Sequence, residues 1–412
     1  MISLPSSNTL LPQVRPQASG NNLYVMPSES TELVKLDLLH EAGSAYQPQP
    51  LCAAAANSLF TLASGRMDAL QVSEFMDYRG IIVEHSQDVF SCQTTFYFLR
   101  RHFDELLPVV EQLLHDPAFP QDDFDAWCRK RKQTMQDRLL KSTEVARRLF
   151  YQTLFGTTHP LGCYADPQDA DRLDRDVVMQ YYHSRFMLRD IVVAGNVDNR
   201  MIDTLTALES NTDLESRRRL VTPDTVPSDR HIALTVPRAT QTTLRIGRVL
   251  PLAWDDLDYA RLMILVTMLG GHFGSRLMSN LREDKGYTYG ITARTQLYRG
   301  VIVFYITTDV ATGTADAAEK EIRHELQRLA EEPVDESELQ LTKNVLAGDF
   351  IRSVDGILER SERFCRMLAT GVSEQLTENL REALATTTPT HLMSLAQRWL
   401  NPDDMIYCRA GA

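Results

Sequence analysis

The sequence contains no run of apolar residues long enough to cross a membrane. A spanning helix needs roughly 18 or more consecutive apolar residues, and no stretch of this 412-residue chain reaches that length. The opening residues, Met1–Asn8, lack the basic and apolar regions of a secretory signal peptide. Hydrophobic residues make up 43% of the chain and charged residues 24%, as in globular proteins that function in water. We therefore expect a cytoplasmic protein without a membrane partner.

Closely spaced cysteine pairs and helical histidine pairs are also missing, and no basic stretch suggests a nucleic-acid surface. The six cysteines are scattered, with no Cys-x-x-Cys pair, which favours reduced thiols over a disulfide framework or a zinc ribbon. No two of the ten histidines stand four residues apart, so the sequence lacks a helical pair of histidine ligands. The net charge of −12 argues against a polyanion partner, and no run of Lys or Arg suggests a nucleic-acid surface.

One pattern of secondary structure occurs twice along the chain. In each half a strand is followed by a helix and, further on, by two long helical patterns. Pro120 and Pro333 precede corresponding helices and are separated by 213 residues, as are Asp125 and Glu338. This repeat predicts two copies of one α+β domain. The predicted strands are 33–39, 81–84, 89–99, 190–198, 242–249 and 301–307, and the predicted helices are 51–63, 68–79, 104–115, 122–155, 256–268, 315–330 and 335–351.

Breaks in this periodicity give the domain boundaries. Pro, Ser and Asn are frequent in the first 22 residues, and Pro223 and Pro227 interrupt the chain between the halves. The predicted units are an irregular N-terminal segment over residues 1–22, an N-terminal α+β domain over 23–210, a linker over 211–230 and a C-terminal α+β domain over 231–412.

Residues 274–290 contain the most informative candidate site. Their apolar spacing predicts a helix over 275–284, which Gly286 ends because glycine readily adopts the left-handed conformation. Tyr289 follows in a strand with one buried face. A helix folded back onto a strand can bring Arg282 and Tyr289 side by side, and a guanidinium beside a phenol suits a carbonyl oxygen or an oxyanion. The alternative is an Arg that complements the helix dipole, followed by a half-buried Tyr.

This segment resembles the second domain of the pitrilysin and mitochondrial-processing-peptidase family, which are zinc peptidases with an inverted His-x-x-Glu-His motif. Stretches of the first half resemble the family's N-terminal domain, so the resemblance spans roughly residues 30–410. It implies an α+β fold of two homologous α/β-sandwich domains, each a mainly antiparallel sheet with helices packed on one face. The first-half stretches are Gly43-Ser44, Phe155-Gly156, His159–Gly162, Tyr181-Tyr182 and Ala194–Asp198.

The resemblance also implies roles for particular residues. In the family, an Arg and a Tyr at this spacing assist catalysis from the C-terminal domain, which implies catalytic roles for Arg282 and Tyr289. Gly270, Gly271 and Gly274 stand where the family carries a glycine-rich loop before the helix. Their implied role is substrate binding through close approach of the backbone to a peptide. A simple tight turn is the alternative for these glycines.

The zinc ligands of the family are missing from this chain. The two possible registers of the first helix place Ala56, Leu59 and Phe60, or Asn57, Phe60 and Thr61, at the His, Glu and His positions. The third ligand would fall within 133–137, where Asp137 is the only carboxylate. One carboxylate does not make a zinc site, so we expect no metal and no other cofactor in this chain.

A chain that lacks the zinc ligands and keeps the Arg/Tyr pair resembles the metal-free subunit of a heterodimeric zinc peptidase. The expected partner is a homologous subunit that carries zinc, and the expected substrate is a peptide or an unfolded polypeptide. The alternative is a non-catalytic structural or binding subunit with the same fold. An independent peptidase with an unrecognised metal site is disfavoured because the ligand positions are apolar.

Overall fold

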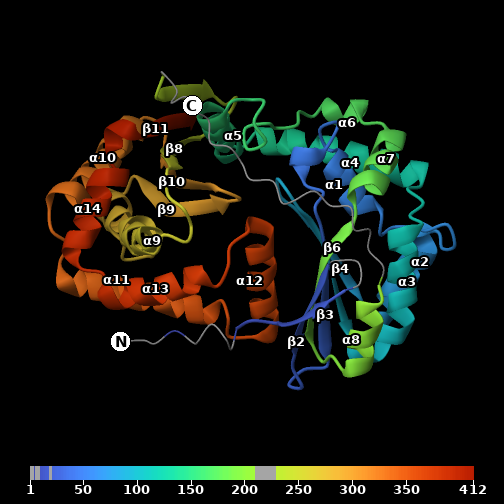
Figure 1. Ribbon diagram of the computed structural model, residues 1–412. Coiled ribbons are helices and arrows are strands. Elements are labelled where there is room, and N and C mark those ends of the chain that lie inside the picture. Colours follow the sequence, from blue (N-terminus) through green and yellow to red (C-terminus); the bar gives the residue numbers. More distant parts are fainter. Residues whose placement is uncertain (1–3, 5–9, 18–20, 209–228) are drawn as a thin grey trace.

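Two β-sheets with surrounding helices make up the structure (Figure 1). The computed structural model describes residue 4 and residues 10–17, 21–208 and 229–412. The first sheet contains β1 (Gln13–Pro16), β2 (Asn22–Pro27), β3 (Leu33–His40), β4 (Ile82–Gln87), β5 (Cys92–Leu99) and β6 (Leu188–Gly195). The second contains β7 (His231–Thr235), β8 (Gln241–Leu250), β9 (Thr288–Tyr298), β10 (Val301–Ala311) and β11 (Ile406–Gly411).

The two sheets share one topology. Their strand orders are β1-β2-β6-β3-β5-β4 and β7-β11-β8-β10-β9. If β1 is set aside, both sheets place the first, fifth, second, fourth and third strands of their half side by side. In both, the first and fifth strands are parallel, whereas the other neighbours are antiparallel. The predicted duplication and the mainly antiparallel α+β fold are therefore confirmed.

Helices of each half pack against the sheet of the same half. In the second half, for example, α9 lies along β9, and α10 lies along β8 and β10. No helix in the described part of the chain has the length and apolar character needed to cross a membrane. The helices are α1 (Cys52–Leu59), α2 (Ala69–Arg79), α3 (Phe103–His115), α4 (Gln121–Leu139), α5 (Ser142–Phe155), α6 (Asp169–Arg172), α7 (Arg175–Arg185), α8 (Asn199–Thr206), α9 (Leu257–Gly270), α10 (Ala315–Glu331), α11 (Glu336–Arg352), α12 (Ile357–Thr370), α13 (Gln375–Thr386) and α14 (Pro389–Trp399).

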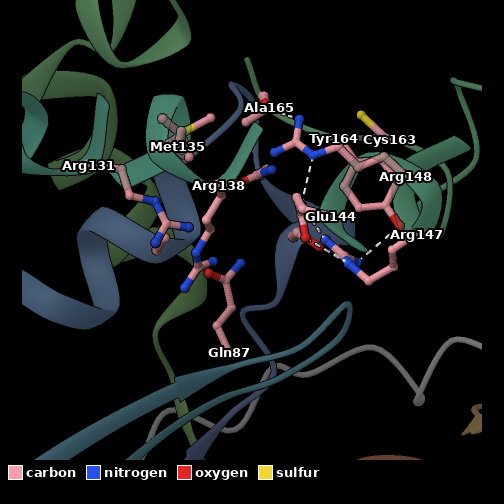
Figure 2. A pocket seen from close by; sticks show the side chains of 14 residues that line it. Gln87, Arg131, Met135, Arg138, Glu144, Arg147, Arg148, Cys163, Tyr164 and Ala165 are labelled. Carbon is pink, nitrogen blue, oxygen red and sulfur yellow. Dashed lines mark hydrogen bonds and ion pairs between the residues drawn. The ribbon is translucent and has the colours of Figure 1, made fainter. Parts of the chain in front are cut away.

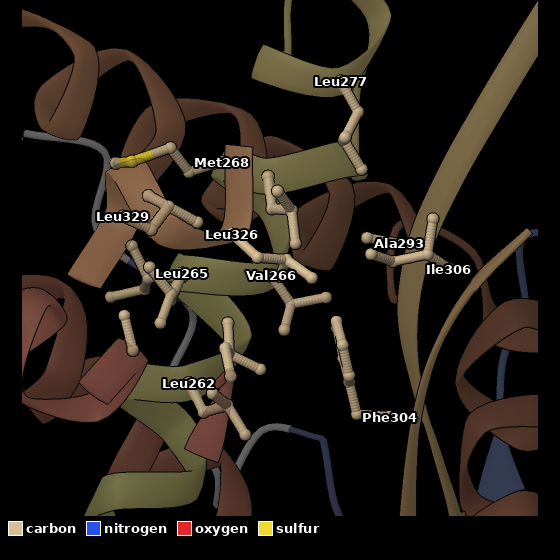
Figure 3. Packing of buried hydrophobic residues seen from close by; sticks show 14 of the residues in the cluster. Leu262, Leu265, Val266, Met268, Leu277, Ala293, Phe304, Ile306, Leu326 and Leu329 are labelled. Carbon is tan, nitrogen blue, oxygen red and sulfur yellow. The ribbon is translucent and has the colours of Figure 1, made fainter. Parts of the chain in front are cut away.

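The core of the second half forms between α9 and the strands beside it (Figure 3). The helix begins at Asp256, whose carboxylate accepts a hydrogen bond of 2.8 Å from the backbone N–H of Asp258. Leu262 and Leu265 of α9 are fully buried, as is Phe304 of β10. Burying a side chain of this kind stabilises the fold by about 1.5–3 kcal/mol relative to leaving it in water. This packing holds β9, the strand that carries Tyr289, in a fixed place.

Each sheet is also covered on its other face by a helix from the opposite half. Phe150 and Leu154 of α5 pack against Val303 and Cys408 of the second sheet. In return, Phe364 of α12 belongs to a buried cluster with residues of β2, β3 and β6 in the first sheet. Figure 1 shows both arrangements, with α12 against the first sheet and α5 beside β8 and β11. The sequence predicted helices on one face of each sheet and did not predict that α5 and α12 cover the other faces. Sequence periodicity does not reveal which half supplies a covering helix.

Two sequence predictions need correction. The pattern over 122–155 is two helices, α4 and α5, because Lys141 has an extended backbone with φ of −93° and ψ of 121°. This break lets α5 leave its own half. The segment 1–22 is not irregular throughout, since it contributes β1 and the first residue of β2. All four residues of β1 are exposed, so the strand is held by backbone pairing to β2 and leaves no hydrophobic alternation to detect.

Residues 211–228 of the predicted linker lie outside the described part of the chain. The first strand of the second half, β7, begins at His231. The boundaries proposed for the two domains remain predictions.

A buried ion pair joins the two halves. The guanidinium of Arg299, in the turn between β9 and β10, donates two hydrogen bonds to the carboxylate of Glu41, which follows β3. Both side chains are only 5% exposed. Burial raises the pKa of Glu41, but the hydrogen bonds from Arg299 and Tyr46 outweigh this, so the pKa lies below its ordinary value. Arg299 also donates to the backbone oxygen of Ala369 at 2.8 Å, which ties the end of α12 to the same point.

We predict that Arg299→Met lowers the free energy of unfolding by about 3–5 kcal/mol. It removes both guanidinium hydrogen bonds to the buried carboxylate of Glu41, which keeps only the hydroxyl of Tyr46 at 2.7 Å and the more distant guanidinium of Arg189 at 4.0 Å. The double variant Glu41→Met/Arg299→Met should recover much of this loss. Urea denaturation of each variant measures the effect.

Arg366→Met is the matched control for this prediction. Arg366 pairs with Glu362 at 3.3 Å, but the two side chains are 60% and 45% exposed. Its loss should change the free energy of unfolding by less than about 1 kcal/mol. If Arg299→Met were as mild as Arg366→Met, the Glu41–Arg299 pair would not be the link between the halves.

Candidate functional site

The segment predicted to carry the site folds as a helix, a glycine turn and a strand. Residues Met278–Asp284 form a π-helix, in which the backbone N–H of Lys285 donates to the carbonyl of Asn280 at 3.0 Å. Gly286 then has a φ of +65°, the left-handed conformation expected of it. The strand β9 begins two residues later, at Thr288. The predicted order of helix, glycine turn and strand is confirmed. The π-helical geometry has no signal in the sequence. Such helices are rare in proteins, and many of those that occur lie at functional sites.

Buried side chains fix this helix against the core. Leu277 and Leu281 are fully buried, and Met278 is 8% exposed. The backbone N–H of Tyr287 donates to the carbonyl of Leu281 at 2.8 Å, which closes the turn. The backbone on either side of the turn is therefore held in place, and Arg282 and Tyr289 project from a rigid support.

The predicted pair, Arg282 and Tyr289, lies on this one unit. Arg282 is half-buried in the last turn of the π-helix, and its guanidinium carbon lies 4.6 Å from the centre of the Phe273 ring. Tyr289 is 89% exposed, so the alternative of a half-buried Tyr is wrong. No hydrogen bond joins the two side chains, and neither makes a hydrogen bond or ion pair with any other described residue. Both retain their donors for a molecule outside the chain.

The three glycines before the helix differ in what the fold requires of them. A Cβ atom on Gly270 would lie 2.6 Å from the backbone nitrogen of Ala293 in β9, and one on Gly271 would lie 2.6 Å from Cα of Thr267. Both positions therefore need glycine for close packing. Gly274 is exposed, and a Cβ there would meet nothing nearer than 3.6 Å. Packing explains Gly270 and Gly271 without a ligand, and substrate binding by the three residues remains a prediction.

The helix that would carry zinc ligands is packed with apolar side chains. Ala56 and Phe60 are 0% exposed and Leu59 is 1% exposed, all within one hydrophobic cluster. In the other register, the side chain of Asn57 donates to the carbonyl of Ser86 at 2.9 Å, and the hydroxyl of Thr61 lies 2.9 Å from Nε2 of His85. These polar groups already have partners within the chain.

The position of the third ligand has the same character. Asp137 is exposed and accepts a hydrogen bond of 2.9 Å from the side chain of Gln133 one helical turn earlier. Across the described residues, no group of three or more His, Cys, Asp or Glu side chains is arranged to hold a metal ion. The residues at these positions therefore do not fit zinc.

Comparison with known proteins identifies the family that this chain resembles. Residues 174–346, which include β6 and most of the second half through α11, match a family described as "Peptidase M16 inactive domain". The resemblance to this family of peptidases, drawn above from sequence motifs, is thereby confirmed.

Two relatives carry names that state a loss of activity. The chain is 24% identical over 294 residues to a protein of Helicobacter pylori named "Non-peptidase homolog YmxG", a match that covers 68% of this chain and 66% of that protein. It is 21% identical over 276 residues to the "Probable inactive metalloprotease YmfF" of Bacillus subtilis, with 62% of each chain covered. The chain thus matches about two thirds of the length of these relatives.

A solved structure shares nearly the whole fold. The crystal structure of a peptidase M16 inactive domain from Pseudomonas fluorescens superposes with a TM-score of 0.86. The superposition covers 97% of this chain and 98% of that one at 19% sequence identity. At this level of identity the comparison establishes the fold alone.

We predict that the isolated chain, purified without chelator, contains no stoichiometric zinc, because Ala56, Leu59 and Phe60 offer no ligands. Elemental analysis by mass spectrometry measures the zinc content directly. One tightly held zinc per chain, together with peptide hydrolysis that a chelator abolishes, would contradict the prediction.

Proposed function

We propose that this chain is the metal-free subunit of a heterodimeric zinc peptidase. In this proposal a homologous partner binds zinc and activates water, while Arg282 and Tyr289 hydrogen-bond the substrate near the bond to be cleaved. The observation that carries the proposal is the pair of uncommitted donors on one rigid helix–strand unit. Tyr289 is exposed, Arg282 is half-buried, and neither side chain makes a hydrogen bond to the described residues, so both are suited to a ligand from outside.

The proposed chemistry uses only hydrogen bonding by this chain. As water adds to the scissile carbonyl, negative charge develops on the carbonyl oxygen. The guanidinium of Arg282 and the hydroxyl of Tyr289 would donate to that oxygen or to the adjoining peptide group. A preformed donor of this kind contributes about 2–4 kcal/mol to the transition state in a site closed to water.

The ring of Phe273 supports this role for Arg282. It lies under the guanidinium and is itself 61% exposed. Stacking on an aromatic ring restricts a flexible Arg side chain while leaving the edge of its guanidinium free to donate hydrogen bonds. The proposed substrate is a peptide or unfolded polypeptide, whose backbone carbonyls are acceptors for such donors.

Mixing this chain with a zinc-bearing homologue should create peptidase activity that neither chain shows alone. The reason is that each would bring one half of a two-part site. Co-purification followed by hydrolysis of an unstructured peptide tests this. A stable complex that cleaves nothing would support the alternative, a structural or binding subunit.

Within an active complex, Arg282→Ala and Tyr289→Phe should each lower kcat/KM by roughly 30- to 1,000-fold. Tyr289→Phe removes one hydroxyl and keeps the ring, so packing is preserved while a donor is lost. Arg282→Lys should also be impaired, because an ammonium does not reproduce the planar fork of donors. Steady-state kinetics and gel filtration of each variant complex give the answer.

Tyr78→Phe provides the matched control for Tyr289→Phe, because Tyr78 on α2 is also 89% exposed. It should leave kcat/KM unchanged. The catalytic role is contradicted if the Arg282 and Tyr289 variants form intact complexes and cleave the peptide at the rate of the unmodified complex.

A further inference from the structure

A small pocket rich in arginine lies between α1, α4 and α5, and neither Arg282 nor Tyr289 lines it (Figure 2). Its volume is about 170 Å³. Among the side chains that line it, four are arginines, Arg131, Arg138, Arg147 and Arg148, and one, Glu144, is a carboxylate. The excess of positive charge contrasts with the net charge of −12 for the whole chain. The pocket therefore has a charge opposite in sign to that of the protein around it.

The single carboxylate is fully used by two of the arginines. Glu144 accepts a hydrogen bond of 2.8 Å from Nη2 of Arg147 and one of 2.8 Å from Nε of Arg148. Arg147 also donates to the hydroxyl of Tyr164 at 3.2 Å, and Arg148 donates to the backbone carbonyl of Ala165 at 3.0 Å. These contacts hold the wall formed by α5 in place, and the described residues that line the pocket include no second acidic group for the other two arginines.

Arg131 and Arg138 project from one side of α4, and neither has an acidic partner among the described residues. Figure 2 shows both side chains directed toward Gln87 at the end of β4. Neither guanidinium makes a hydrogen bond or ion pair with any described residue, and the Nε atom of Arg131 is buried without an acceptor. Burial, together with the nearby charges of Arg138 and Arg148, lowers the pKa of Arg131. Such an uncompensated cation destabilises the fold unless an anion binds beside it.

We propose that this pocket binds a small oxyanion, that is, the carboxylate or phosphate group of a ligand. Guanidinium groups bind both kinds of anion through paired hydrogen bonds. Arg131 is half-buried and Arg138 is exposed, so the anion enters past Arg138 and is held by Arg131. The pocket is smaller than the ~300–1,000 Å³ of sites that enclose whole cofactors or drug-sized molecules. It therefore holds an anionic group or an anion of a few atoms. This site is independent of the proposed peptidase role.

The test is calorimetric titration of the isolated chain with three probes, at an ionic strength of about 0.15 M so that exposed charges outside the pocket are screened. These are inorganic phosphate, N-acetylalanine, and N-acetylalanine amide as the uncharged counterpart. Saturable binding of phosphate or of N-acetylalanine, with none for the amide, is the expected result. The probe that binds more tightly identifies the phosphate or the carboxylate as the preferred group. Bound anion should also raise the thermal unfolding midpoint, by an amount that grows with the logarithm of the anion concentration above its Kd.

Arg131→Gln and Arg138→Gln should each weaken binding by roughly 10- to 100-fold, the value of a hydrogen bond to a charged group. Arg129→Gln is the matched control, because Arg129 is exposed on the same helix, does not line the pocket and carries the same charge. It should leave the affinity within about two-fold, since an exposed charge outside the site acts only weakly at this distance. Arg131→Gln should not lower the unfolding midpoint in the absence of anion.

The proposal is overturned if neither anion binds saturably. It is also overturned if Arg129→Gln weakens binding as much as Arg131→Gln, because the effect would then follow net charge alone. Arg138→Gln keeps the test valid should the Arg131 variant fold poorly, because Arg138 is exposed at the mouth of the pocket and has no structural partner among the described residues.

Discussion

The exchange of covering helices between the halves is the constraint on which the rest of this structure depends. The first sheet is completed by α12 and the second by α5, so neither half buries both faces of its sheet alone. The Glu41–Arg299 pair and the hydrogen bond from Arg299 to Ala369 lie along the same boundary. Because apolar burial and a desolvated ion pair act together there, the two halves are held as one unit. The positions of α1 and of Tyr289 relative to each other follow from this joining of the two halves.

The structure separates two kinds of residue that a peptidase of this fold would combine. At the zinc positions, Ala56, Leu59 and Phe60 have become part of a hydrophobic core. On the Arg282–Tyr289 unit, by contrast, polar groups remain at the surface although aromatic side chains gain free energy from burial. Polar residues at the zinc positions form hydrogen bonds inside the chain. Asn57 bonds to the carbonyl of Ser86, and Thr61 lies within hydrogen-bond distance of His85. Tyr289 differs from Asn57 and Thr61 in that its polar group is not used within the described part of the chain.

Sequence reasoning succeeded where the signal is local or repeated. The strands, the Gly286 turn and the duplicated order follow from periodicity and from glycine conformation, which act over a few residues. It missed the exchange of α5 and α12, because an apolar stripe shows that a helix is covered without showing by what. It also missed the pocket beside Arg131, since α4 reads as an ordinary charged helix until Arg147 and Arg148 are brought to it from α5. The strand β1 was not predicted because its side chains are all exposed and show no apolar alternation.

The exchanged helices also have a consequence for synthesis of the chain on the ribosome. The strands of the first sheet are complete once Gly195 has been made, but the helix that covers their second face ends at Thr370. During the intervening elongation the apolar residues Leu39, Val192 and Ala194 have no cover from α12. Exposed apolar sheet surface in a nascent chain attracts other chains and the chaperones that shield them. Because α12 is synthesised late, this face of the first sheet needs shielding from other chains while the ribosome completes the protein.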